Sequence, residues 1–516
     1  MPSLSIHLLS IALCLSSGFQ QGYIASVINQ PYKQIQQYIN DSWVIQFGQP
    51  IGPATLDLIW SFLNVCFPIA TIFGQLFANI ACARLGRKKT AILATALYIP
   101  GTLLCGLSKY LMPAFELLFV GRIIWSFANG LSSVNATIWI VECAPPKIRG
   151  RMASQQEVAM ALGSLTTQGL GVLFSTDELW PFNFFPNCLI ALVNILMFIP
   201  IYESPQYIME KYGDVDMARK ALASYHGCSV TDESVDQEMR ICEESIEKGK
   251  KTSDQKVEKP TIKTEYTSNE IMFMPWRSRD QASQLIRHAA WLGVMVKIAY
   301  VFTGARCLRS YSTFILYGLS HWGYYQANLG SFIIGLVRVP VTLLPVFLVD
   351  RIGRRPLIVG STFISFVSLI LMMVSIDIGP SWKIGTFVGL ALLLLINTCG
   401  IGSVSRFYSA ELVPRHLLLS SVATLTMFES ISKIAVEFAF YPVANVIGAQ
   451  ALLLFIVPTA ILTIAMWFWC PETSRKTVNE VLNEMAQRRK LDVSFPMPVE
   501  ITFSKDFCQF YFNTGK

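Results

Sequence analysis

The sequence predicts an all-α membrane protein with twelve transmembrane helices in two six-helix bundles. Of its 516 residues, 53% are hydrophobic and only 15% are charged, whereas soluble chains carry about 25% charged residues. Windows such as 58–81, 384–402 and 451–470 contain few or no charges, and about 20 such residues span a bilayer as a helix. Three charged motifs also occur twice at nearly constant separation, which indicates duplicated halves. These observations disfavour a soluble enzyme.

The predicted spans divide the chain into two bundles, an insert and a tail. The spans are expected near 5–27, 56–82, 91–112, 115–142, 153–175, 181–201, 287–318, 326–349, 356–376, 384–410, 418–445 and 450–470. The first span lacks the basic start and the cleavage site of a signal peptide, so we expect it to remain as a helix. The corresponding domains are 1–201, an insert at 202–286, a second bundle at 287–470 and a tail at 471–516. Helical spacing and then low complexity predict short surface helices and a flexible linker in the insert.

Basic residues predict the orientation in the membrane. They gather in alternate loops, and the basic residues of these loops are Arg84, Arg87, Lys88, Lys89, Lys147, Arg149, Arg151, Arg351, Arg354, Arg355, Arg475 and Lys476. By the positive-inside rule, both termini and the insert are cytoplasmic, in the plasma membrane by our prediction. The net charge of +7 is explained by this topology rather than by a nucleic-acid partner. The loop after the first span is then external, and its Asn40-Asp41-Ser42 sequon predicts N-glycosylation of Asn40.

The repeated motifs pair arginine with glutamate beside a glycine turn. Gly86 and Gly353 permit tight turns between helices, and the glutamates can accept bidentate bonds from the arginines. We expect such clusters to lock the two halves together on the basic side of the membrane when the protein is open toward the other side, although topogenic charge alone is an alternative. The predicted cluster residues are Arg84, Arg87, Glu142, Arg149, Glu203, Arg351, Arg354, Arg355, Glu411 and Glu472.

Together these and further motifs resemble the facilitative glucose transporter family of the major facilitator superfamily. The resemblance covers nearly the whole chain, and the motifs that carry it are Gly22-Tyr23, Ile28–Pro31, Arg84–Lys88, Gly121-Arg122, Glu142–Arg151, Gln168, Glu203–Pro205, Asp350–Arg355, Glu411 and Pro471–Thr473. It implies two six-helix bundles, a central site open to each side in turn, and a cytoplasmic gate formed by the Arg/Glu clusters. It also implies transport of a sugar or related solute, with no enzymatic activity.

The expected sugar-binding positions depart from that family. Registered on Thr303-Gly304, the chain has Tyr300, Val301 and Arg306 where sugar-carrying members have two glutamines and an asparagine. Other registered positions carry charge where the family has neutral side chains, and these are Glu157, Arg338, Arg406 and Glu429. Neutral amides donate to and accept from hydroxyl groups, so the exchange changes what this site can bind.

Seven ionisable residues are therefore expected near the middle of the membrane. They are Glu157, Arg306, Arg309, Arg338, Arg406, Glu429 and Lys433. Each costs at least about 2.5–3.5 kcal/mol there, so they must face a cavity or one another. One interpretation is a set of clamps, with Glu429 bound to Lys433 or Glu157 bound to an arginine. The other is that the surplus of arginines forms a pocket for an organic anion.

Three glutamines bear on how the solute is bound, and one isoleucine bears on whether transport is coupled to protons. Gln20, Gln21 and Gln168 either bind solute hydroxyls or join helices. Ile24 stands where proton-coupled relatives have Asp, which favours a uniporter, with Glu157 as the alternative proton carrier. The leading function is facilitated transport of a sugar-like solute, and the alternatives are organic-anion transport and solute sensing without transport. The expected partners are that solute and the lipid bilayer, and no cofactor or metal is predicted.

Overall fold

The computed structural model describes residues 3–229, 232, 235–236, 239–240, 268–276, 278, 280–413, 415–474, 476 and 478–489. The side chains of some helical residues, Arg149 and Arg406 among them, lie outside this description. Over the described residues the secondary structure is helical, with no strand. The low-complexity stretch of the insert and the end of the tail fall outside the described residues.

The N-terminal half has six membrane-length segments. They are α1 and α2 (Leu4–Leu13 and Phe19–Ser26, joined by a π-helical turn), α4 (Pro53–Leu85), α5 (Arg87–Leu107), α6 (Glu116–Cys143), α7 (Pro146–Phe174) and α8 (Pro186–Phe198). The amphipathic helix α3 (Tyr32–Phe47) follows the first segment. The first predicted span is thus a helix that packs within the half, as expected, since α2 contacts α7.

The C-terminal half repeats this arrangement with more breaks. Its segments are α13 and α14 (Gln281–Phe302 and Ala305–Ser310), α16 and α17 (Tyr324–Val341 and Leu344–Ile352), α18 (Arg354–Ile378), α19 and α20 (Lys383–Cys399 and Ile401–Glu411), α21 (Arg415–Ile447) and α22 (Leu453–Trp469). The short α15 (Ser312–Phe314) continues the first of these segments. α13 begins at Gln281, before the predicted start of the second bundle at 287.

Nine stretches in the described part are long and apolar enough to cross a membrane, against twelve predicted spans. One of them, Thr426–Trp469, contains most of α21 and all of α22. The segments missing from the nine are α7 and α16–α17. Both carry polar cavity residues, including Glu157 and Arg338, which lower the mean hydropathy of a helix. The twelve segments therefore correspond one to one with the twelve predicted spans.

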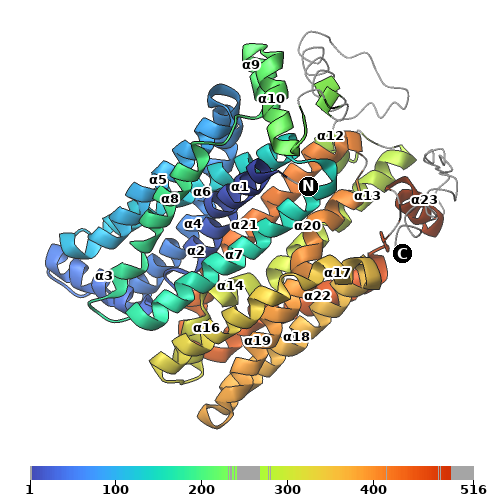
Figure 1. The fold of residues 1–516 in the computed structure, drawn as a ribbon. Helices are drawn as coiled ribbons and strands as arrows, with labels where there is room; N and C mark the ends of the chain where they lie inside the picture. Colours follow the sequence, from blue (N-terminus) through green and yellow to red (C-terminus); the bar gives the residue numbers. More distant parts are fainter. Residues whose placement is uncertain are drawn as a thin grey trace, which may run out of the picture.

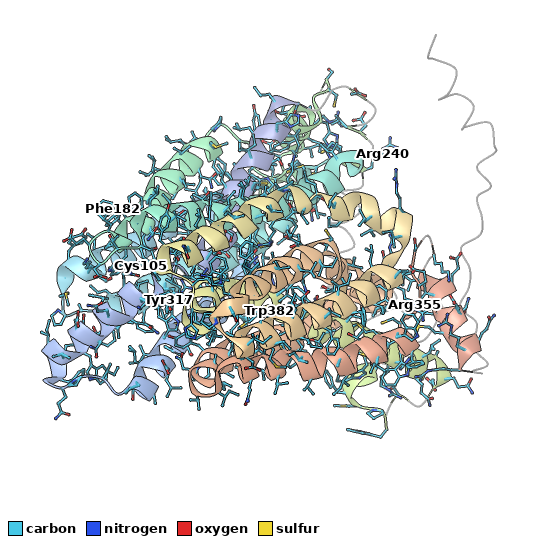
Figure 2. All side chains as sticks on the ribbon, turned by 90° about the horizontal axis from the view of Figure 1, so that it is seen from below. Cys105, Phe182, Arg240, Tyr317, Arg355 and Trp382 are labelled. Atoms are coloured by element: carbon cyan, nitrogen blue, oxygen red, sulfur yellow. The ribbon has the colours of Figure 1, made fainter. Side chains whose placement is uncertain are left out.

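The two halves lie side by side and meet through α4 against α21 and α7 against α16. Figure 1 shows the helices between and after the halves, α9 (Pro205–Tyr212), α10 (Val215–His226), α12 (Ser268–Phe273) and α23 (Val478–Arg488), at one end of the bundles and α3 at the other. We call the end with Arg87 and Arg354 the basic face. Figure 2 labels Arg355 near this face and Tyr317 toward the opposite one.

The helices outside the bundles are attached to different halves. The Ser3 hydroxyl donates to the Tyr225 carbonyl at 2.8 Å, and Ser5 is hydrogen bonded to Ser224 at 2.8 Å, which ties α10 to α1. On the other side, the Trp291 indole N–H of α13 donates to the Met272 carbonyl of α12 at 3.3 Å. The surface helices predicted at the start of the insert are therefore present as α9 and α10.

Two glycine breaks shape the walls between the halves. Gly304 adopts a positive φ of 72° and separates α13 from α14. Gly400 separates α19 from α20, and a Cβ there would lie 2.1 Å from the Ser361 Cβ. The Ser361 hydroxyl accepts the freed Ile401 N–H at 2.9 Å. The bend between α19 and α20 therefore forms at a glycine.

Candidate solute site and gates

A cavity of about 860 Å³ lies between the two halves. The N-terminal half contributes residues such as Gln21, Gln75 and Glu157, and the C-terminal half contributes the wall that contains Tyr300 and Asn397. The lining extends from Arg309 and Leu394 in the middle of the bundles to Ser154 and Val349, near the basic face. A solute in this cavity would touch both halves at once.

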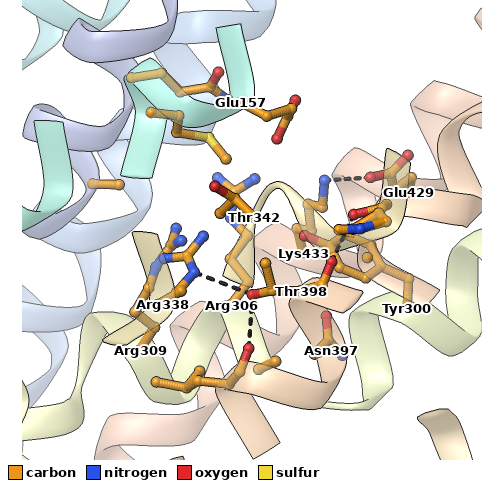
Figure 3. A pocket seen from close by; sticks show the side chains of 18 of the residues that line it. Glu157, Tyr300, Arg306, Arg309, Arg338, Thr342, Asn397, Thr398, Glu429 and Lys433 are labelled. Atoms are coloured by element: carbon orange, nitrogen blue, oxygen red, sulfur yellow. Dashed lines mark hydrogen bonds and ion pairs between the residues drawn. The ribbon is translucent and has the colours of Figure 1, made fainter. Parts of the chain in front are cut away.

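The structure brings five of the eight predicted solute-binding residues to this cavity, namely Gln21, Glu157, Arg306, Arg338 and Glu429. Figure 3 shows Glu157 across the pocket from the three labelled arginines. The side chain of a sixth predicted residue, Arg406, is outside the described part of the structure. Val301, registered to a family glutamine, is buried in the core instead.

Gln20 and Gln168 do not line the large cavity. The Gln20 amide donates to Asn187 Oδ1 at 2.7 Å and accepts from the Trp125 indole N–H at 2.9 Å, so it joins helices of the N-terminal half. Gln168 is buried beside a hollow of about 10 Å³ and donates weakly to Ser331 of the other half at 3.4 Å. The helix-joining interpretation describes both residues in this conformation.

Charged side chains at the cavity wall form two groups of ion pairs. Arg306 Nε lies 3.0 Å from Glu437 Oε1. Glu429 accepts from Lys297 Nζ at 2.9 Å and also from Lys433, one helical turn along α21. The predicted clamp between Glu429 and Lys433 is thus present.

Sequence reasoning missed Lys297 and Glu437. Glu437 follows Lys433 by one further turn of α21, so continuing the spacing of Glu429 and Lys433 would have found it. Lys297 carries no comparable signal, because its partner lies on a distant helix.

Arg309 and Arg338 differ from these paired cations. Arg338 Nε donates to the Thr398 hydroxyl at 3.2 Å, and Arg309 Nε is buried without a hydrogen-bond partner. Within the described residues, neither guanidinium forms an ion pair. Both arginines also border the hollow of about 10 Å³ that lies beside Gln168. The cavity therefore contains two neighbouring cations that have no carboxylate partner among the described residues.

The Arg/Glu cluster of the N-terminal half holds its own helices together on the basic face. Arg87 binds Glu142 through two bonds, at 2.9 Å and 2.5 Å, and the Ser204 hydroxyl donates to the same carboxylate at 2.5 Å. Glu203 instead accepts the main-chain N–H groups of Arg87 and Lys88 at 2.9 and 3.0 Å, which caps α5. Burial raises the pKa of Glu203, although these bonds favour its charged form.

The C-terminal cluster repeats this design, but its Arg–Glu contact is longer. Glu472 accepts the main-chain N–H groups of Arg354 and Arg355 at 2.9 and 3.0 Å, and Thr473 donates to Glu411 at 2.5 Å. The Arg354–Glu411 distance is 3.6 Å, against 2.5 Å for Arg87–Glu142. Arg84 and Arg351 are exposed.

These ion pairs lie within one half each, so in this conformation they do not join the halves. The expected lock between halves stays a prediction for the opposite conformation.

Contacts between the halves gather on the face opposite the basic face. The Tyr324 hydroxyl is hydrogen bonded to the Gln30 carbonyl and to Gln34 Oε1, the latter at 2.7 Å. Lys33 donates to the Tyr317 hydroxyl at 2.9 Å, and Gln36 donates to the Tyr441 hydroxyl at 2.8 Å. We call these residues the outer contact set. Because they close this face, the cavity opens toward the basic face.

Replacing Tyr324 by phenylalanine is expected to loosen the outer contact set. The loss of a hydroxyl that joins the halves costs about 1 kcal/mol, which raises the population open on that face about fivefold. In nanodiscs, hydrogen–deuterium exchange of the segments around Gln34 and Tyr324 should then be faster in this variant than in the unchanged protein. Tyr325→Phe is the control, because that neighbouring side chain is 63% exposed. Equal exchange in the two variants would contradict the prediction.

The predicted glycosylation site lies in a helix. Asn40 and Ser42 belong to α3, where Ser42 is buried and the Asn40 amide oxygen accepts the Ile51 N–H at 3.3 Å. The modification stays a prediction. Among the described residues, no group of three or more His, Cys, Asp or Glu side chains is placed to hold a metal ion.

Two six-helix halves around one cavity, with contacts that close a single face, define an integral membrane carrier of the major facilitator fold. The chain belongs to the sugar (and other) transporter family, whose model matches residues 9–485. It is 25% identical over 490 residues to the solute carrier family 2, facilitated glucose transporter member 1 of Gallus gallus, with 93% of each chain covered. It is 24% identical over 505 residues to member 9 of Homo sapiens, with 95% of this chain and 86% of that one covered.

A solved structure shares the fold. The inward-open conformation of the xylose transporter XylE from E. coli superposes with a TM-score of 0.73 at 18% identity, covering 93% of this chain and 99% of that chain. That likeness agrees with the arrangement of the two halves described above.

Proposed function

We propose that the chain carries a sugar or a sugar-like solute across the membrane by alternating access, as a facilitative uniporter. The observation that carries the proposal is the large cavity that both halves line and that opens on one face. Closing that face and opening the other would expose the same residues to the second compartment. The solute-binding residues in this proposal are Gln21, Glu157, Arg306, Arg338 and Glu429.

The orientation forms part of the proposal. The positive-inside rule supports a cytoplasmic basic face, with both termini and the insert 202–286 in the cytoplasm of a plasma-membrane protein. The conformation described above is then inward-open. The Arg/Glu clusters would approach each other across the halves only when the carrier faces outward, and that motion would make them the inner gate.

Uniport is supported by the residue at the first helix. Ile24 cannot load or release a proton, and it is fully buried. Glu157 is the carboxylate of the N-terminal half that lines the cavity, so it is our candidate for a proton carrier in place of Ile24. We expect saturable uptake that is independent of a pH gradient.

Uptake of labelled D-glucose and D-xylose into proteoliposomes, with and without a pH gradient, tests this function. Saturable uptake, counterflow and an unchanged rate under the gradient are expected. Gln21→Ala should raise KM about tenfold, because it removes a hydrogen bond made to the solute. Acidification that accompanies uptake and disappears in Glu157→Gln would overturn the uniport. Specific binding of a solute without any flux would favour the sensor interpretation.

A further inference from the structure

We propose that Arg309 and Arg338 form a carboxylate subsite, so that the solute is a polyhydroxylated carboxylate of the hexuronate type rather than a neutral sugar. This inference rests on the proposed function, since it names the substrate class of the same cavity. It depends on the charge balance of the cavity, on the geometry of the two guanidiniums and on the neutral polar groups beside them.

The charge balance leaves two cations in excess. Among the described residues, the cavity lining includes Arg306, Arg309, Arg338 and Lys433 with Glu157 and Glu429, and the ion pairs of this lining add Lys297 and Glu437. The ion pairs set Glu429 against Lys297 and Lys433, and Glu437 against Arg306. Among the described residues, Arg309 and Arg338 are the two cations of this set that form no ion pair. An unpaired charge at this depth is costly, so it is expected to serve a ligand.

The geometry suits a carboxylate. Arg309 and Arg338 border the same two hollows, and Figure 3 shows them side by side on one wall. Guanidinium groups present parallel N–H donors that match the two oxygens of a carboxylate. The buried Arg309 Nε has no hydrogen-bond partner in the described structure, so the donors of this guanidinium are not all used by the protein.

The neighbouring groups suit hydroxyls. Asn397, Thr398 and Ser403 line the cavity on the wall of the arginines, and Gln21 and Gln75 line it from the other half. Amides and hydroxyls both donate and accept, as hydroxyl-bearing ligands require. A carboxylate carried on a ring of hydroxyls would thus find a partner for each kind of group.

Binding of D-glucuronate and D-glucose to the full chain in nanodiscs tests this subsite, because the two ligands differ only in a carboxylate against a hydroxymethyl group. By calorimetric titration at constant ionic strength, glucuronate should bind at least about tenfold more tightly. The preference should fall to within about twofold in Arg309→Gln and in Arg338→Gln. Arg309→Lys should keep part of the preference for glucuronate, since lysine keeps the charge but lacks the two parallel N–H donors of a guanidinium. Arg488→Gln, at an exposed position of α23, is the matched control.

The results separate this inference from the proposed function. Equal affinity for the two ligands, binding of neither, or an unchanged preference in both glutamine variants would overturn the carboxylate subsite. Glucose flux through proteoliposomes would then still support transport. Conversely, tight glucuronate binding that depends on both arginines but gives no flux would retain the subsite and overturn transport.

Discussion

Replacing Glu429 by glutamine is expected to lower the free energy of unfolding by about 3–5 kcal/mol, the usual cost of removing one partner from a buried ion pair. Glu429 accepts from Lys297 at 2.9 Å and from Lys433, and the three side chains are 8–15% exposed. Glutamine keeps the shape but removes the negative charge that both lysines bind. Unfolding in mixed micelles at increasing fractions of a denaturing detergent measures the loss.

A matched control exists on the same chain. Glu484 also accepts from two cations, Lys476 at 2.5 Å and Arg488 at 2.8 Å, and Arg488 follows it by four residues. These side chains are 31–48% exposed, so Glu484→Gln should cost less than about 1 kcal/mol. Combining Glu429→Gln with Lys433→Met should recover part of the lost stability, because one stranded charge is removed. Equal losses for Glu429→Gln and Glu484→Gln would show that burial does not set the strength of the first group.

The second large effect is expected at Glu142. Glu142→Ala should also cost about 3–5 kcal/mol, because it strands Arg87, and the pair is only 7–9% exposed. The duplicated halves supply the comparison. Glu411→Ala removes the equivalent carboxylate, but its Arg354 contact is longer at 3.6 Å and the Glu411 side chain is 31% exposed. We expect about 1 kcal/mol there.

Unfolding of the two alanine variants under identical conditions measures this asymmetry. Similar losses at Glu142 and Glu411 would mean that the two clusters are energetically equivalent despite their different geometry.

The predictable part of this protein is the part that rests on local pattern. Hydropathy located all twelve segments, and repeated spacing located Glu142, Glu411 and the glycine turns, because those features depend on neighbours in the sequence. The roles of Glu203 and Glu472 were only half predicted. They were expected to bind arginine side chains, but they cap helices by accepting main-chain N–H groups.

The rest depends on which helices meet. Lys297 pairs with Glu429 across 132 positions of sequence, and nothing local to Lys297 indicates that contact. Gln20 and Gln21 are adjacent, yet they point to a helix interface and to the cavity respectively, a difference set by the rotation of α2. The position of the bend at Gly400 likewise depends on the Ser361 hydroxyl, which lies on another helix.

The separate attachment of the surface helices has a mechanical consequence. α10 is bonded to the first helix, whereas α12 and α23 pack on α13 of the other half. Each half therefore carries its own surface helices outside the bundle. When the two halves move relative to each other, the distance between α10 and α23 should change with them. A pair of dyes on α10 and α23 would turn each transport cycle into an optical signal. A protein that bound both α10 and α23 would hold the carrier in one conformation without touching the solute site.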